Sequence, residues 1–122
     1  MASKKTIDVN GLTKGGPYSH AVISGNLVFV SGQTGNTPDK DTNFSEQFQN
    51  AISRIDEILK ACGSGLQNIL KVTVYLSDAG FFKEMNDLFA KYFPNNPPAR
   101  TTVIAGFVSK GVYVELDVIA AL

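Results

Sequence analysis

A long amphipathic segment in the middle of the chain limits its fold more than any other feature. Apolar side chains recur there at spacings of three and four, as on one face of a helix: Phe44, Phe48, Ala51, Ile52, Ile55, Ile58, Leu59 and Cys62. Asn43 and Glu46 match the capping box that begins helices, and Gly63 is suited to end one. The sequence therefore predicts a helix from Phe44 to Cys62, with Cys62 as a structural residue of the buried face and not a nucleophile.

A second helix and several strands are predicted from the remaining apolar segments. The helix runs from about Ala79 to Tyr92, with Asp78 as its N-cap and Pro94 at its end. Gly25 and Asn26 predict a tight turn between two of the strands. The expected strands are Thr6–Val9, His20–Ile23, Leu27–Gln33, Ile69–Leu76, Arg100–Ala105 and Gly111–Ala120. This order predicts a single α+β domain over residues 1–122, a mixed β-sheet with two helices packed on one face.

The alternation within the strands indicates that the other face of the sheet needs a partner. Lys71, Thr73 and Tyr75 point away from the apolar residues between them, and residues 112–118 alternate in the same way. The two helices can cover only the wholly apolar face. The second face is expected to carry Phe29, Tyr75, Ile104, Tyr113 and Ile119. Because these aromatic and aliphatic residues have no cover within the chain, we expect a homo-oligomer with polar groups in its interface.

Charge and composition argue against several classes of protein. Eleven Lys and Arg balance eleven Asp and Glu, whereas nucleic-acid binders have a basic surplus. One cysteine and one histidine cannot form a Cys-rich or His-rich metal site, and His20 is expected to be structural or to lie at the surface. The N-terminus lacks the apolar core of a signal peptide, and no apolar run is long enough to span a bilayer. We therefore expect a cytoplasmic protein with no membrane segment.

Three residues are candidates for chemistry, and the residue types alone leave two interpretations of each. Arg100 begins an apolar strand after two prolines. It is either a solvated strand end or a receptor that holds a carboxylate through two parallel hydrogen bonds. Glu115 is an ordinary surface residue, or a carboxyl whose pKa rises because another subunit buries it. Tyr18 follows Gly15-Gly16-Pro17. It either packs on the neighbouring hairpin or presents its hydroxyl at the edge of a pocket.

At these positions the chain resembles the reactive intermediate deaminase family, also called the RidA or YjgF family. The matching segments follow one another over essentially the whole chain: Gly16–Val22, Val30–Gln33, Lys71–Asp78, Met85-Asn86, Pro98–Thr101 and Val114-Glu115. Each piece alone is weak, but the combination is specific. The resemblance implies a chorismate-mutase-like fold, a homotrimer with three clefts between subunits, and a site that uses no metal or organic cofactor. It also implies hydrolysis of enamines and imines, such as 2-aminoacrylate and 2-iminopropionate, to 2-keto acids and ammonia.

The resemblance further implies roles for individual residues, carried over by their positions in the motifs. Arg100 would hold the substrate carboxylate, and Glu115 would position the attacking water. Three more polar residues would line the pocket: Tyr18, Ser31 and Asn86. Thr102 stands where active members commonly have a cysteine. That position contributes its backbone carbonyl as well as its side chain, and a threonine keeps the carbonyl.

Two other functions stay open beside the deaminase. The chain could bind small 2-keto or amino acids in the same cleft without turnover, as a sensor, and Thr102 is the residue that keeps this alternative open. An activity on RNA, described for some relatives, is disfavoured by the zero net charge and the lack of a basic run, because phosphate contacts dominate such binding.

Overall fold

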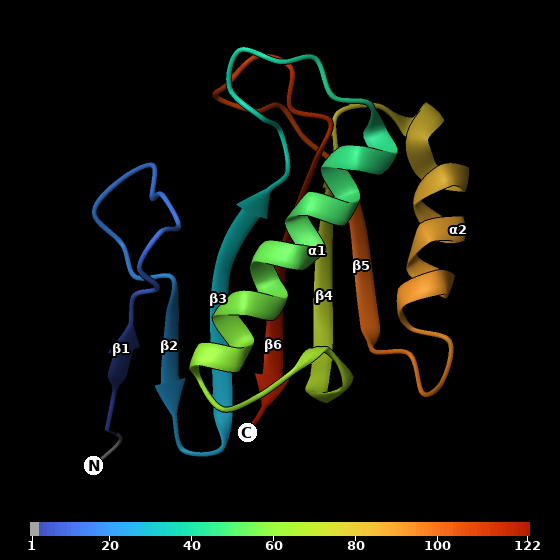
Figure 1. Cartoon of the computed structure of the whole chain (residues 1–122). Coiled ribbons are helices and arrows are strands. Elements are labelled where there is room, and N and C mark those ends of the chain that lie inside the picture. The colour runs from blue at the N-terminus through green and yellow to red at the C-terminus, as the bar shows by residue number, and fades with distance from the viewer. Residues whose placement is uncertain (1–2) are drawn as a thin grey trace.

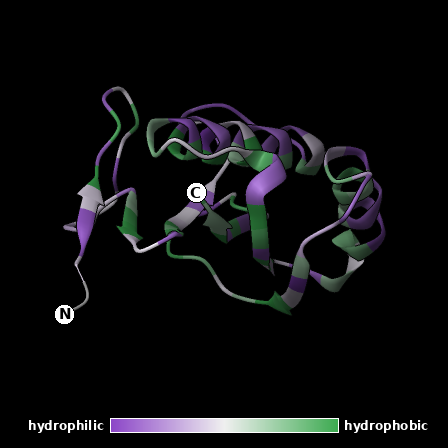
Figure 2. Cartoon of the chain, turned by 90° about the horizontal axis from the view of Figure 1, so that it is seen from below, coloured by the Kyte–Doolittle hydropathy of each residue, from purple (hydrophilic) through white to green (hydrophobic). Residues whose placement is uncertain are grey.

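Within residues 3–122, six strands form one mixed sheet in the order β1-β2-β3-β6-β4-β5 (Figure 1). The structure is a computed structural model and describes residues 3–122. The strands are β1 Lys5–Ile7, β2 Ala21–Ser24, β3 Leu27–Thr34, β4 Ile69–Leu76, β5 Ala99–Ile104 and β6 Val114–Ala121, and the helices are α1 Phe44–Ala61 and α2 Phe82–Tyr92. Neighbouring strands are antiparallel except β4 and β5, which are parallel. Both helices lie on the same side of the sheet, as the sequence predicts (Figure 2).

Helix α1 begins and ends at the predicted signals. The Asn43 side chain accepts a hydrogen bond from the Glu46 N–H at 2.8 Å, and the Glu46 carboxylate accepts one from the Asn43 N–H at 3.4 Å. Gly63 follows the helix with φ +83°, a backbone conformation that glycine adopts without steric cost. The apolar stripe is buried against the sheet, and burial raises the pKa of the Cys62 thiol. Cys62 therefore belongs to the core, as predicted.

Two predicted elements begin three residues later in the structure, each because of a particular contact, and the other predicted bounds differ by at most two residues. The second helix begins with a 3-10 turn over Ala79–Phe81, because the Asp78 carboxylate accepts from the Gly80 N–H at 2.6 Å, only two residues on. Strand β6 begins at Val114 and not at Gly111. The residues before it are held by α1 instead: Gln47 Nε2 donates to the Gly111 carbonyl and Gln47 Oε1 accepts from the Tyr113 N–H, both at 2.8 Å.

The face of the sheet that points away from the helices carries exposed apolar residues, as predicted. Phe29 of β3 pairs with Ile119 of β6 on this face, and 41% of Phe29 is exposed. Tyr75 of β4 pairs with Val103 of β5, which is 40% exposed. Apolar residues on an open sheet face are what the predicted contact between subunits requires, and that contact stays a prediction.

Two residues expected on this open face lie elsewhere. Ile104 pairs with Leu76, a fully buried core residue, so it lies on the helix-covered side of β5. Tyr113 precedes β6, and its ring centre lies 5.3 Å from that of Phe81 in the turn before α2. The prediction for Ile104 is wrong because alternation alone does not give the register of a parallel edge strand. The prediction for Tyr113 is wrong because Gln47 draws residues 111–113 toward α1.

We predict that Gln47→Leu lowers the free energy of unfolding by about 3 kcal/mol, because the partly buried Tyr113 N–H and Gly111 carbonyl lose their partners. Gln47 is fully buried, and its Nε2 also contacts the Thr42 hydroxyl at 3.1 Å. Urea denaturation measures the change. Gln49→Leu is the matched control on the same helix, because exposed Gln49 bonds only the nearby Ser45 hydroxyl, and it should change stability by less than about 0.5 kcal/mol. Equal effects of the two substitutions would contradict the prediction.

Candidate active site

Three of the residues predicted for the site line one cavity of about 790 Å³ at the end of the sheet: Tyr18, Ser31 and Glu115. The cavity lies between the loop that follows β1, the last residues of β3 and the segment that precedes β6. Gly32 of β3 and Arg54 of α1 also line it. The fold therefore brings half of the predicted site together within one chain.

Three hydrogen bonds fix the loop that carries Tyr18, and one of them joins it to β3. The Ser31 hydroxyl donates to the Ser19 carbonyl at 2.7 Å, and buried His20 accepts from the Val9 N–H through Nδ1 at 2.9 Å. His20 is structural, which is one of the two outcomes expected for it. The Tyr18 hydroxyl accepts from the Gly15 N–H at 2.9 Å and closes the glycine-rich turn on itself. Because this bond uses only a lone pair, the phenol proton is available for donation to a ligand.

Glu115 is a carboxyl in a confined position. It lies on β6 opposite Thr34 of β3, just beyond a register shift between Val30 and Gln33. Its carboxylate rests on Gly32, where an added Cβ would lie 2.2 Å from Oε2. Only glycine leaves room for the carboxylate in this place.

Burial raises the pKa of Glu115, and the negative charge of Asp117 raises it further. Asp117 accepts a hydrogen bond from the Tyr75 hydroxyl at 2.8 Å, and this bond, with burial and the nearby charges, raises the pKa of Tyr75. Glu115 therefore exchanges its proton at a higher pH than an ordinary glutamate does. A carboxyl with a raised pKa is suited to accept a proton in one step and return it in the next.

Arg100 lies on the edge strand β5, on the side of the sheet that α2 covers. Its guanidinium carbon is 4.9 Å from the ring centre of Phe89 and 5.8 Å from that of Phe82, both cation–π distances. Its Nη1 lies 3.5 Å from the Met85 sulfur. Among residues 3–122, no carboxylate is within ion-pair distance of Arg100. The guanidinium is thus held by aromatic faces while its N–H groups can still bind an anion.

Thr102 and Asn86 lie on the same side of the sheet as Arg100. Thr102 is two residues further along β5, and its hydroxyl is buried with no hydrogen-bond partner in the described part of the chain. Asn86 follows Met85 on α2. These three residues form the second half of the predicted site.

The structure does not bring Arg100 and Glu115 together within one chain. Arg100 pairs with Val72 of β4, whose side chain is in the core beneath the helices. Glu115 pairs with Tyr75, whose side chain is on the open face. The two predicted site side chains therefore lie on opposite faces of the sheet, two strands apart. A small molecule cannot contact both residues of the same subunit.

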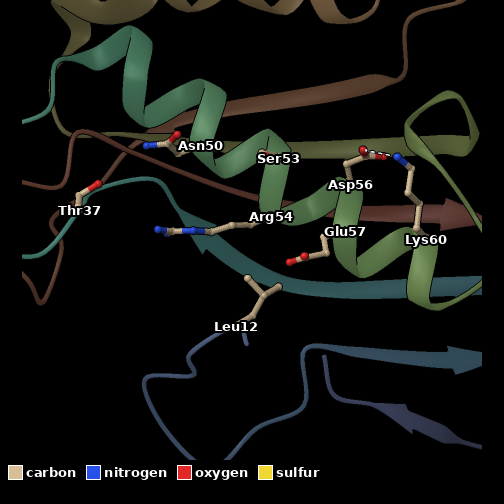
Figure 3. A pocket seen from close by; sticks show the side chains of 8 residues that line it. All are labelled: Leu12, Thr37, Asn50, Ser53, Arg54, Asp56, Glu57 and Lys60. Atoms are coloured by element: carbon tan, nitrogen blue, oxygen red, sulfur yellow. Dashed lines mark ion pairs between the residues drawn. The ribbon is translucent and has the colours of Figure 1, made fainter. Parts of the chain in front are cut away.

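Gly32 and Arg54 were not assigned a role by the sequence analysis. Gly32 lies within a segment that matches the family, so that segment held a usable signal. Arg54 had none, because a charged residue on the outer face of a helix is ordinary. Arg54 also lines a hollow of about 640 Å³ along the outside of α1, together with Leu12, Asn50 and Lys60 (Figure 3).

Within residues 3–122, no group of three His, Cys, Asp or Glu side chains could hold a metal ion. Neither helix in this range is long and apolar enough to cross a membrane.

Comparisons with known proteins place this geometry in a family. The sequence model described as Endoribonuclease L-PSP matches residues 10–122. The chain is 41% identical to "Protein mmf2, mitochondrial" of Schizosaccharomyces pombe, over 98% of each chain. It is 37% identical to the 2-iminobutanoate/2-iminopropanoate deaminase of Bos taurus, over 86% of this chain and 80% of the bovine one.

A solved structure agrees with these sequence matches. RidA from the Antarctic bacterium Psychrobacter superimposes with a TM-score of 0.88 at 31% identity, over 97% of this chain and 99% of the bacterial one. The cytoplasmic location stays a prediction, because the fission yeast relative is named a mitochondrial protein. With the family model, the curated relatives and the solved fold in agreement, the chain belongs to the RidA/YjgF family, the Endoribonuclease L-PSP family of the sequence model.

Proposed function

We propose that this protein hydrolyses enamine and imine intermediates of amino-acid chemistry, such as 2-aminoacrylate and 2-iminopropionate, to 2-keto acids and ammonia. The observation that carries the proposal is the Glu115 carboxyl, held over Gly32 in a polar cavity with its pKa raised. The relative from Bos taurus, named a 2-iminobutanoate/2-iminopropanoate deaminase, supports this class of substrate.

The proposed site needs two subunits, because the substrate must reach both Arg100 and Glu115. Arg100 of one subunit faces the Glu115 cavity of its neighbour, so the contact joins two different surfaces of the chain. Contacts of this kind form a closed ring when the rotation between neighbouring subunits closes. We propose a homotrimer with three equivalent clefts, as the family resemblance implies. Exposed Phe29 and Val103 on the open face of the sheet supply apolar surface for such an interface.

Substrate binding depends on Arg100 in this mechanism. Its guanidinium holds the substrate carboxylate through two parallel hydrogen bonds, while Phe82 and Phe89 fix its orientation. Asn86 and Thr102 line the same side of the cleft, and Tyr18 and Ser31 line the other. Holding the imine carbon beside one positioned water lowers the barrier by several kcal/mol, about what orientation alone contributes elsewhere.

The chemical steps use Glu115 as a proton carrier. Water adds to the carbon of the protonated imine, one proton of the water passes to the Glu115 carboxylate, and the C=N electrons move to nitrogen. Glu115 then returns the proton to nitrogen, the C–N bond breaks, and ammonia leaves. The hydroxyl oxygen forms the carbonyl as its proton passes to the Glu115 carboxylate and from there to the ammonia. The sum converts one protonated imine and one water to one 2-keto acid and one ammonium ion. An enamine enters this sequence as its imine tautomer.

Thr102 favours a second candidate function, the binding of small 2-keto or amino acids without turnover. Its buried hydroxyl has no partner within residues 3–122, so a hydrogen bond to a ligand would satisfy it. Release of keto acid from freshly generated 2-aminoacrylate separates the deaminase from this sensor. The description of the family model names a ribonuclease, but the zero net charge of the chain disfavours an activity on RNA.

Arg100→Ala is expected to lower kcat/KM for carboxylate-bearing imines by several hundredfold, because two charge-assisted hydrogen bonds worth roughly 3–5 kcal/mol are lost. Arg100→Lys should restore little of this, since an ammonium cannot form the paired contact. Ammonia release measures the rate. Lys83→Ala is the matched control, because Lys83 is an exposed cation of α2 that pairs only with Asp87. Parent activity in Arg100→Ala would refute the anchoring role.

The pH dependence of kcat/KM is expected to show an acid limb that belongs to Glu115. The carboxyl must be ionised to accept a proton, so activity rises with pH through its raised pKa, above the ordinary value for glutamate. Asp117→Asn keeps an acceptor for Tyr75 but removes the neighbouring charge, so the limb should move to lower pH. Glu115→Gln should cost about a hundredfold or more in rate. The limb should not move in Asp87→Asn, which changes a distant exposed carboxylate.

Mixing two inactive variants tests whether the site lies between subunits. Subunits with Arg100→Ala and subunits with Glu115→Gln, unfolded together and refolded at equal amounts, should regain about a quarter of the parent activity. Clefts with both intact side chains form only where the two kinds of subunit meet in the right order. Sedimentation should show a trimer throughout. A monomer with full activity would exclude the shared site.

A further inference from the structure

Two side chains of α1 hold the segment that follows β3. Arg54 Nη1 donates to the Thr34 carbonyl, and Arg54 Nη2 donates to the Asn36 carbonyl at 3.4 Å. Asn50, one helical turn earlier, donates to the Gly35 carbonyl at 2.9 Å. Three consecutive carbonyls of a connecting segment are therefore bound by one face of the helix. Figure 3 shows the side chains of Asn50 and Arg54 extending from α1 in the same direction.

The same segment lies directly on the backbone of α1. A Cβ added to Gly35 would be 1.7 Å from the Gln47 carbonyl oxygen, so no larger residue fits at this distance. The backbone contact at Gly35 limits how near the segment comes to the helix. The hydrogen bonds from Asn50 and Arg54 limit how far it moves away. Together these contacts fix the distance between residues 34–36 and α1.

The position of this segment determines the surroundings of Glu115. Thr34 is both the last residue of β3 and the register partner of Glu115. Gly32, two residues earlier, lies against the Glu115 carboxylate. Gly32 lies within the register shift between Val30 and Gln33, and Thr34 follows it, so the regular ladder with β6 is interrupted at this end of β3. A bulged strand end is less constrained by its own ladder and depends more on other contacts.

Arg54 does not act on Glu115 as a neighbouring charge. A nearby cation lowers the pKa of a carboxyl, whereas the pKa of Glu115 is raised by burial and by Asp117. The guanidinium is directed instead to the carbonyls of Thr34 and Asn36. The other titratable groups near Glu115 are Tyr75 on β4 and Tyr18 on the opposite wall of the cavity.

We infer that Asn50 and Arg54 are positioning residues for the reaction: they hold residues 34–36 on α1, and the end of β3 then keeps the Glu115 carboxyl in place in the cavity. The inference rests on the proposed function of Glu115. Neither residue touches the reacting atoms. Their contribution is the geometry of the proton carrier, and they leave the affinity for the substrate carboxylate unchanged.

Arg54→Gln and Asn50→Ala test the inference through the split between kcat and KM. Each should lower kcat by about tenfold, since a displacement well under 1 Å is costly for an oriented proton carrier, and should change KM by less than about twofold. Arg54→Lys should recover part of the loss, because an ammonium can still donate to a carbonyl. Gly32→Ala, which displaces the carboxylate directly, should give the same split.

Carbon NMR of the Glu115 carboxyl supplies a measurement that does not depend on activity. Loosening the segment admits water, so the pKa of Glu115 should fall toward the ordinary value in Arg54→Gln and in Asn50→Ala. Lys60→Gln is the matched control, because it removes a cation from the same helix at a residue that pairs with Asp56 at 3.0 Å. Its kcat and its Glu115 titration should equal those of the parent.

Three results would overturn the inference. A rise in KM with unchanged kcat would make Arg54 a substrate-binding residue. A lower melting temperature with unchanged kcat and unchanged Glu115 titration would make its role purely structural. An unchanged Glu115 titration in both variants would refute positioning even if the parent protein proved inactive on imines. In that last case inactivity of the parent refutes the proposed function by itself, and the titration still decides the role of Asn50 and Arg54.

Discussion

The packing of β6 against α1 decides on which side of the sheet each functional side chain lies. Val114, Leu116 and Val118 are buried beneath the helix, so the residues between them must point to the open face. Glu115 and Asp117 are therefore placed by the core and not by their own interactions. A slip of one residue in the pairing of β6 would bury both carboxylates and expose the core. The hydrophobic stripe of α1 thus specifies the location of the proposed proton carrier.

Local signals in the sequence predicted the elements whose ends are made by neighbouring residues. The capping box of Asn43 and Glu46 and the glycine after Cys62 mark α1 without reference to the rest of the chain. Where the structure differs from the prediction, contacts between residues far apart in the sequence are the cause. The start of β6 depends on Gln47, which lies 66 residues before Tyr113. The side on which Ile104 lies depends on the parallel register with β4, which no alternation within β5 encodes.

In the candidate site, too, residue types could be recognised from the local sequence, whereas their arrangement depends on contacts between distant segments. Arg100, Glu115 and Tyr18 could be singled out from their types and local context, and the family resemblance added Ser31, Asn86 and Thr102. That these residues form two groups on opposite faces follows from the register of β4 with β5 and β6, which was not predicted. Arg54 was missed because its meaning depends on which loop carbonyls it meets, and those belong to a segment 18 and 20 residues away.

Separation of the two charges is also what preserves their chemistry. An arginine and a glutamate at contact distance in one chain form an ion pair, which lowers the pKa of the carboxyl and fills the donors of the guanidinium. In this fold the sheet stands between them. Arg100 rests on the rings of Phe82 and Phe89, which stabilise a cation without neutralising it. Glu115 is partly buried and lies near the negative charge of Asp117, and both effects favour its protonated form. The proposed assembly would therefore bring together a guanidinium whose N–H groups can still bind an anion and a carboxyl of raised pKa. In the proposed mechanism the substrate carboxylate binds Arg100 and so prevents Arg100 from pairing with Glu115.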